Sequence, residues 1–139
     1  MADEIDPADL VNEKQHGYVF PHPQGGFLEM RVLADPEAPE HDLWDAGRRI
    51  PNERVEQFRV RGLRPGRPGR LVLRTVIDRL SRLDVTVNGR PRTVELTPAP
   101  GWSEVSLELD PAEVTGELNV TITPRLGEWV NYHVWGLTR

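Results

Sequence analysis

The feature that most constrains the fold is an alternation of apolar and polar side chains, with a period of two, through the last two-thirds of the chain. Leu83, Val85 and Val87 alternate with polar residues, and the pair Asn88-Gly89 that follows favours the positive φ of a tight hairpin. The expected strands cover residues 27–33, 54–61, 70–77, 83–88, 92–97, 105–109, 118–123 and 130–137. About eight short strands separated by turns predict an all-β fold, an antiparallel β-sandwich or jelly roll.

The remaining organisation follows from the turn residues and from the lack of a helical period. A long connection rich in Pro, Asp and Glu spans residues 34–53, and residues 110–113 are expected to form one helical turn. A parallel fold is excluded because the chain offers no crossover helices. Residues 1–16 are acidic and are expected to be a flexible or loosely docked lead-in. Residues 17–139 then form a single sandwich domain.

Composition excludes several classes of site. The chain has no cysteine, so it has no disulfide, no thiolate nucleophile and no zinc–thiolate site. No apolar run approaches the ~18 residues of a membrane span. The first residues are acidic and lack the apolar stretch of a secretory signal, so we expect a cytoplasmic protein, unless the domain was excised from a longer chain.

The charge is divided sharply along the chain. Residues 1–45 carry 2 basic and 11 acidic residues, residues 46–92 carry 13 and 4, and residues 93–139 carry 2 and 7. One interpretation is internal pairing, with the acidic N-terminal part lying across the arginine-rich middle. The other is a face that binds phosphate, carboxylate or an acidic sugar. Nucleic acid is not expected as a partner, because the arginines are not interleaved with aromatic residues and the acidic flanks repel phosphates.

A family resemblance covers the chain from Phe58 to its end. A central strand at residues 71–74 is followed by a strand that ends in Asn-Gly at residues 83–90, then by a strand that begins with Gly-Trp at residues 101–109, and by a closing aromatic strand. This order resembles the galactose-binding-like jelly roll of carbohydrate-binding modules. The resemblance implies the fold and raises the expectation of sugar recognition, but it carries over no binding residues.

The closing aromatic run is the leading candidate for a binding site. On a regular strand Trp129, Asn131, His133 and Trp135 would share one face. Two flat indole rings, an amide and an imidazole suit a sugar, whose C–H face packs on aromatic rings while its hydroxyls hydrogen-bond. The alternative is that this face belongs to the core and that the tryptophans pack there.

Two further residues complete the predicted ligand-binding set. Trp44 lies in the long connection, where a large aromatic residue forms either a lid over a ligand or an anchor for the loop. The second is Arg74, which with Arg59 and Arg61 lies on strands that are expected to be neighbours. Together they form either a cationic floor for an anion or a solvated outer face.

No catalytic or metal-binding residue is predicted. The four histidines, at positions 16, 22, 41 and 133, lack the spacing of a transition-metal site, and no nucleophile motif or phosphate loop is present. No cofactor is expected. Calcium bound by loop carboxylates is left open, and the candidates are Asp35, Glu37, Glu40, Asp42 and Asp45.

These observations favour a non-catalytic ligand-binding module that recognises a carbohydrate or a sugar-containing ligand. Two alternatives stay open at this point. One is a small stand-alone β-barrel enzyme of the cyclase or isomerase type. The other is a protein–protein interaction domain, including a homodimer formed through an exposed edge strand.

Overall fold

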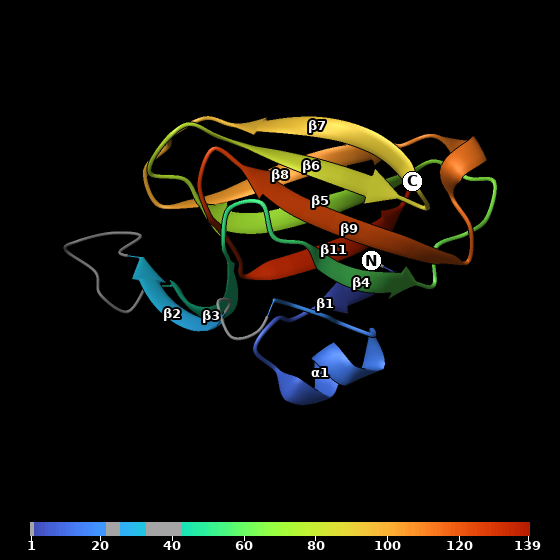
Figure 1. The fold of residues 1–139 in the computed structure, drawn as a ribbon. Coiled ribbons are helices and arrows are strands. Elements are labelled where there is room, and N and C mark those ends of the chain that lie inside the picture. The colour runs from blue at the N-terminus through green and yellow to red at the C-terminus, as the bar shows by residue number, and fades with distance from the viewer. Residues whose placement is uncertain (1, 22–25, 33–42) are drawn as a thin grey trace.

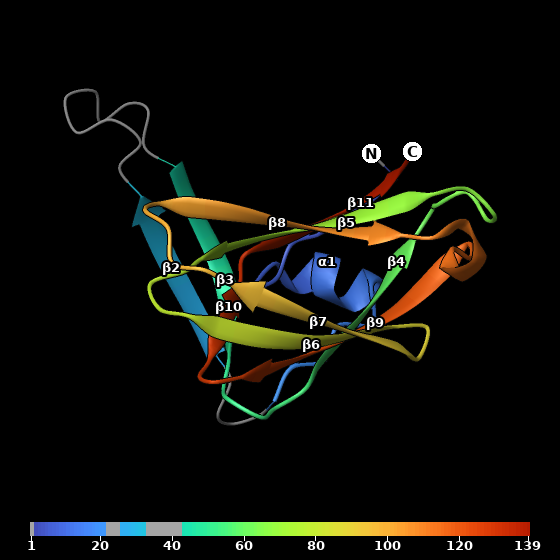
Figure 2. The same cartoon turned by 90° about the horizontal axis from the view of Figure 1, so that it is seen from above.

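The computed structural model describes residues 2–21, 26–32 and 43–139 and shows two four-stranded antiparallel sheets packed face to face (Figures 1 and 2). The first sheet has the order β1-β11-β5-β8, with β1 Asp3–Ile5, β11 His133–Thr138, β5 Gly69–Val76 and β8 Trp102–Leu109. The second has the order β4-β9-β6-β7, with β4 Glu56–Arg61, β9 Glu117–Arg125, β6 Ser81–Val87 and β7 Arg90–Leu96. The predicted antiparallel sandwich is therefore confirmed.

Smaller elements close the ends and one edge of the sandwich. A third sheet has the order β10-β3-β2, with β10 Trp129–Asn131, β3 Leu43–Ile50 and β2 Gly26–Val32, and it runs across one end of the two main sheets (Figure 2). Helix α1, Leu10–Gln15, lies below the edge where β1 and β4 come together (Figure 1). A short 3-10 helix, Pro111–Glu113, forms the helical turn expected there.

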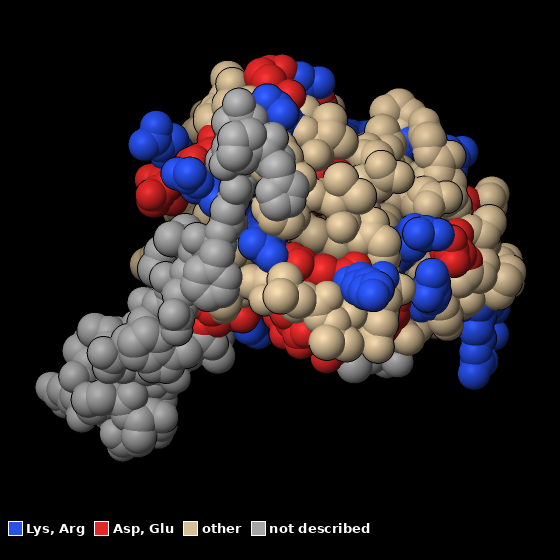
Figure 3. Space-filling model, turned by 60° about the horizontal axis from the view of Figure 1, so that its bottom comes forward, with Lys and Arg blue, Asp and Glu red and all other residues tan. Residues whose placement is uncertain are grey.

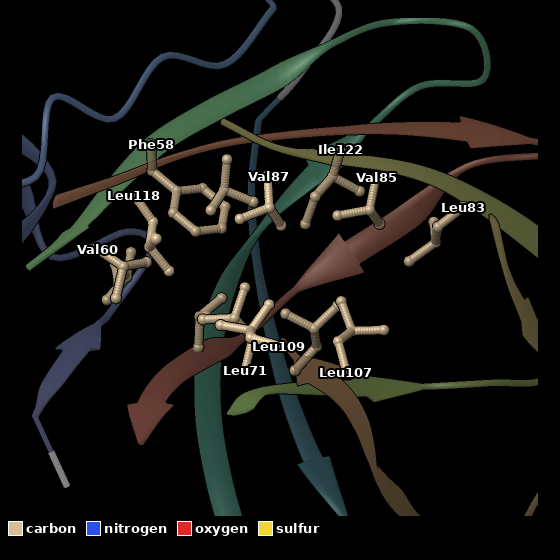
Figure 4. Packing of buried hydrophobic residues seen from close by; sticks show 14 of the residues in the cluster. Phe58, Val60, Leu71, Leu83, Val85, Val87, Leu107, Leu109, Leu118 and Ile122 are labelled. Atoms are coloured by element: carbon tan, nitrogen blue, oxygen red, sulfur yellow. The ribbon is translucent and has the colours of Figure 1, made fainter. Parts of the chain in front are cut away.

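The core lies between the inner faces of the two main sheets (Figure 4). Side chains alternate between buried and partly exposed along the whole of β5, as the period of two requires. Leu71 and Leu73 of the first sheet thereby face Phe58 of the second, and none of the three is more than 1% exposed. Burial of such apolar side chains is the main stabilising term of the fold.

The strand pattern read from the sequence is largely confirmed, with three differences. The Asn88-Gly89 hairpin is present, and both residues have positive φ, 51° and 80°. The long connection expected over residues 34–53 contains strand β3, and β1 was missed because it is only three residues long. The single closing strand expected over residues 130–137 is divided between β10 and β11.

The segment expected to be a loosely docked lead-in is integrated into the sandwich. Strand β1 pairs with β11, and Ile5 on it is fully buried in the core. The carboxylate of Asp9 caps α1 by accepting from the backbone N–H groups of residues 11 and 12. Glu13 then forms two hydrogen bonds, of 2.8 and 2.9 Å, with the guanidinium of Arg48 on β3, which ties the helix to the third sheet.

Internal pairing accounts for most of the divided charge. The N-terminal carboxylates of Glu13 and Asp45 pair with arginines 48 and 74. Carboxylates of the last third, which include Glu104, Glu108, Glu113 and Glu117, pair with further arginines of the middle. Acidic and basic side chains lie side by side over the face seen in Figure 3. On the described surface, acidic and basic side chains are therefore intermixed, and the acidic residues come from both the N-terminal part and the last third of the chain.

A polar cluster inside the apolar core surrounds Glu56, the first residue of β4. Its side chain is fully buried and accepts hydrogen bonds from the Tyr18 hydroxyl and, at 3.0 Å, from Asn131 Nδ2. Trp129 also faces this carboxylate, in a looser geometry than that of a formed hydrogen bond. The second oxygen, Oε1, has no partner among the described residues. The cluster joins the N-terminal segment, the second sheet and β10.

Burial changes the proton affinity of Glu56. Loss of hydration disfavours the carboxylate and raises its pKa to about 7, although the hydrogen bonds from Tyr18, Asn131 and Trp129 act in the opposite direction. The unfolded chain exposes this group, whose pKa then returns to the ordinary value of 4.5. The folded protein therefore holds a proton on Glu56 through mildly acidic pH.

The hairpin predicts that Gly89→Ala lowers stability by about 1 kcal/mol, because an L-residue with a side chain is strained at this positive φ. No atom lies within 4 Å of the Cβ position at Gly89, so the strain comes from the backbone alone. Gly116→Ala is the matched control, since its Cβ position is equally open and its φ is not positive. Urea unfolding of both variants checks this. An equal effect at the two glycines would contradict it.

The Glu56 cluster predicts a stability that falls as pH rises. Because the folded pKa lies above the unfolded one, the contribution of Glu56 is fully present below about pH 4.5 and is lost as pH rises through about 7. Glu56→Gln mimics the protonated form and removes this loss. Between pH 5 and pH 8 we expect the variant to gain about 3 kcal/mol relative to the native chain. Urea unfolding at both pH values measures this, with the exposed Glu95→Gln as control. A parallel pH dependence of native chain and variant would refute it.

Candidate functional site

The aromatic run at the end of the chain is split between two environments. Trp129 and Asn131 point into the protein and are 3% and 0% exposed, whereas His133 and Trp135 point outward from the first sheet. The prediction that these four side chains share one face is therefore wrong. The physical reason is a change of sheet at Tyr132, where the chain leaves its pairing with β3 and joins β5.

The alternation of sides shifts by one residue at this change of sheet. Asn131 and Tyr132 are consecutive and are both fully buried. The amide of Asn131 is bound to Glu56, and the backbone N–H of Tyr132 donates to the carbonyl of Arg74 at 3.1 Å. Strand β3 passes closely here, because a Cβ on Gly47 would lie 2.5 Å from the Asn131 carbonyl oxygen. Two buried residues in succession thus turn every odd-numbered residue of β11 outward.

Tyr132 is packed inside the protein at the point where the chain changes sheets. Its ring meets that of Trp102 edge-on, with the centroids 4.7 Å apart. Burial and the nearby Asp45 carboxylate raise the pKa of Tyr132 to about 12. The ring is fully buried, so Tyr132 acts as packing.

The outward half of the run forms an open aromatic platform on the first sheet. Trp135 and three neighbours line a shallow depression of about 190 Å³. Cross-strand register places Val72 opposite Trp135 and Arg74 opposite both His133 and Glu104. We call this surface the Trp135 platform, and its residues are Val72, Arg74, Glu104, His133, Trp135 and Leu137.

Arg74 holds the platform in place from beside the indole. Its guanidinium carbon lies 4.9 Å from the centroid of the Trp135 ring, a cation–π distance. The same guanidinium forms ion pairs with Asp45 at 3.2 Å and with Glu104 at 3.6 Å. Because both carboxylates already balance its charge, Arg74 orients the ring and leaves the more exposed Glu104 available to accept hydrogen bonds.

His133 also lies against the indole. Its ring lies 4.3 Å from that of Trp135, and its side chain is only 13% exposed. Its two nitrogens face Glu4 at 3.4 Å and Asp6 at 3.6 Å. Burial raises the pKa of Asp6, although His133 beside it acts in the opposite direction. His133 therefore positions Trp135 more than it offers surface to a ligand.

The remaining predicted residues are not gathered at the platform. Trp44 lies on the backbone of β3, but its side chain falls outside the described residues, as do four of the five candidate calcium ligands. Arg59 and Arg61 lie on β4, in the other main sheet from Arg74, and both pair with Glu117. Of the two interpretations given for these arginines, the shared cationic floor is not formed, and Arg59 and Arg61 are exposed.

Sequence reasoning missed three residues of the platform: Val72, Glu104 and Leu137. Val72 and Leu137 lie within expected strands and Glu104 lies just before one, but the sequence does not give the strand order that places β8 and β11 on either side of β5. The sequence offered one signal for Leu137. It lies two residues after Trp135, so the two side chains share a face of the same strand.

Two absences apply to the described part of the chain. In residues 2–21, 26–32 and 43–139 no group of three or more His, Cys, Asp or Glu residues is arranged to hold a metal ion. No helix within these ranges is long and apolar enough to cross a membrane.

Comparison with known proteins gives a likeness of fold at low sequence identity. No protein-family model matches the sequence, and no curated protein matches it. A 4-O-methyl-α-glucuronidase of family GH115, BtGH115A, matches 78% of the chain with a TM-score of 0.53 and 12% identity. The chain spans only 16% of the length of that enzyme.

Two isolated modules match over almost their whole length. The carbohydrate-binding module CBM36, solved in complex with calcium and xylotriose, has a TM-score of 0.55 at 9% identity, covering 96% of this chain and 98% of that one. The C-terminal CBM6 of LamC, a marine laminarinase from Zobellia galactanivorans, has a TM-score of 0.55 at 13% identity, with all of both chains covered. None of these comparisons supports the predicted homodimer. The chain thus has the jelly-roll β-sandwich fold of carbohydrate-binding modules.

Proposed function

We propose that this protein is a non-catalytic carbohydrate-binding module and that the Trp135 platform is its sugar-binding surface. The observation that carries the proposal is a tryptophan ring held on the open face of a sheet, within the fold that carbohydrate-binding modules share. The predicted contact set is thereby revised. Trp135 makes the contact, Glu104 joins it, and Trp129 and Asn131 leave it because they are buried.

The chemistry of the platform matches that of a sugar ring. The indole of Trp135, with the apolar side chains of Val72 and Leu137 beside it, offers a surface on which the C–H face of a sugar can pack. The side chain of Glu104 is 56% exposed and can accept hydrogen bonds from hydroxyl groups. Apolar and aromatic side chains accompanied by a few polar groups are the usual lining of a small-ligand site.

The platform is also ordered before a ligand arrives. Arg74 and His133 both contact the Trp135 ring and are themselves held by carboxylates. A side chain fixed in this way loses little conformational entropy when it binds, and that entropy is one of the main costs of association. The supporting residues therefore contribute to affinity without touching the sugar.

Glu56, whose pKa is raised by burial, does not take part in ligand binding. Glu56 is fully buried beneath Tyr18 and Asn131, so no ligand on the surface can reach it. The space between the main sheets is filled by apolar side chains, as Figure 4 shows. These features fit a binding module better than a barrel enzyme with a catalytic group in its interior.

The proposal predicts that Trp135→Ala lowers the affinity for a bound oligosaccharide at least tenfold, because the stacking surface is lost. Trp135→Phe should recover part of the affinity, since it keeps an aromatic ring. Isothermal titration with a panel of neutral oligosaccharides that includes xylotriose gives the measurement.

Thermal unfolding separates loss of binding from loss of fold. Trp135 lies on the outer face, so we expect Trp135→Ala to unfold close to the native temperature, whereas Trp129→Ala, which empties a buried site, should unfold well below it. If folded Trp135→Ala binds an oligosaccharide as tightly as the native chain does, the platform is not the sugar-binding site. If no oligosaccharide in a broad panel binds to the native chain, the proposed function is refuted.

A further inference from the structure

A second hollow lies at the end of the sandwich where both termini lie, beside the loop that joins β4 to β5 (Figures 1 and 2). Its volume is about 440 Å³. The residues that line it are Ala2, Gly62, Arg64, Arg67, Thr138 and Arg139. Three of these six are arginines, which gives the hollow a positive charge. We call it the arginine pocket.

The arginines of this pocket are less neutralised than Arg74 at the Trp135 platform. Arg64 and Arg67 form no ion pair with a carboxylate among the described residues, and Arg139 pairs only with Glu108, at 2.8 Å. By contrast, Arg74 at the Trp135 platform is balanced by two carboxylates. A guanidinium presents several N–H donors in a fixed plane and is suited to bind planar or tetrahedral anions.

The loop that carries these arginines is held by backbone hydrogen bonds. The N–H of Arg64 donates to the Thr138 hydroxyl at 3.3 Å, and the N–H of Arg139 donates to the carbonyl of Pro68 at 2.8 Å. One guanidinium N–H of Arg67 donates to a main-chain oxygen of Arg139, the last residue of the sequence, at 3.4 Å, and its other donors remain for a ligand. The loop is thus fixed against the end of β11 before any anion binds.

Strand β11 connects the pocket to the platform. Trp135, Leu137 and Arg139 are alternate residues, and the side chain of Arg139 reaches Glu108 on the same outer face, where Glu108 also meets Arg70. At a strand rise of about 3.3 Å per residue, the backbone at Arg139 lies about 13 Å from that at Trp135. A short oligosaccharide can span such a distance.

We propose that the arginine pocket binds the carboxylate or sulfate group of an acidic glycan whose neighbouring sugar stacks on Trp135. This ligand class rests on the proposed function, because the platform supplies the sugar contact. Arg64 and Arg67 supply the free donors, while Arg139 borders the pocket on the side of the platform. The pocket gives the module a preference for charged over neutral glycans, which the platform, with its several carboxylates, does not provide.

The test compares a neutral oligosaccharide with its carboxylated and sulfated analogues by isothermal titration at low salt. We expect the charged glycans to bind about tenfold more tightly than the neutral one, as charge-assisted hydrogen bonds predict. The double variant Arg64→Gln/Arg67→Gln should abolish that preference and leave the affinity for the neutral glycan unchanged. The carboxylated and sulfated arms decide which anion is preferred.

A matched control excludes a general effect of charge. Arg54→Gln/Arg82→Gln removes two exposed arginines near the other main sheet, changes the net charge by the same amount and should retain the preference. Thermal unfolding of both double variants shows that each is folded. A charged glycan that binds no more tightly than the neutral one, or a preference that survives in Arg64→Gln/Arg67→Gln, overturns the arginine pocket.

Two further measurements separate this inference from the proposed function. Trp135→Ala should weaken neutral and charged glycans by the same factor, which keeps their ratio. Inorganic sulfate, titrated alone and followed by amide chemical shifts, reports on the pocket without a sugar. If sulfate binding depends on Arg64 and Arg67 but no neutral glycan binds, the arginine pocket is supported as an anion site and the Trp135 platform is refuted as a sugar site. If sulfate and the charged glycans both bind independently of these arginines, the pocket is refuted.

Discussion

The geometry of the outer face depends on one local constraint, the burial of two consecutive side chains where the last strand changes sheets. Asn131 is fixed by its hydrogen bond to Glu56, and Tyr132 by its backbone bond to Arg74. These contacts set the register of everything that follows, because side chains on a strand alternate with a strict period of two. A slip of one residue would bury Trp135 and expose Val134. The carboxyl group inside the core is therefore linked to the surface through the register of a single strand.

Glu56 shows how a destabilising group can specify a structure. A buried carboxyl group is unfavourable unless it is protonated or hydrogen-bonded, and here both conditions apply. Its partners come from two separate parts of the chain: Tyr18 from the N-terminal segment, and Trp129 and Asn131 from β10. An apolar residue at position 56 would make none of these directional contacts. We interpret the cluster as the feature that aligns these segments.

Electrostatics on the surface follows from the same packing. Most arginines of the middle of the chain find carboxylates on neighbouring strands, and exposed pairs of this kind contribute little stability each. Around Trp135 the carboxylates of Glu4, Asp6, Asp45 and Glu104 outnumber the guanidinium of Arg74. Arg64 and Arg67, by contrast, line one pocket together with Arg139. A platform without net positive charge and a basic pocket near the end of the same strand suit different parts of one ligand.

The sequence by itself determined the fold class, most strand positions and the Asn88-Gly89 hairpin, because alternation and turn chemistry are local properties of the chain. It also identified Trp135, His133 and Arg74 as candidates. It could not separate them from Trp129 and Asn131, since the change of sheet at Tyr132 is imposed by contacts with Gly47, Glu56 and Arg74, which are distant in sequence. Nor could it predict Glu104 at the platform or the loop of Arg64 and Arg67 beside the end of β11. Only the tertiary structure decided which side of each strand faces water, because strand order and register arise from packing between segments.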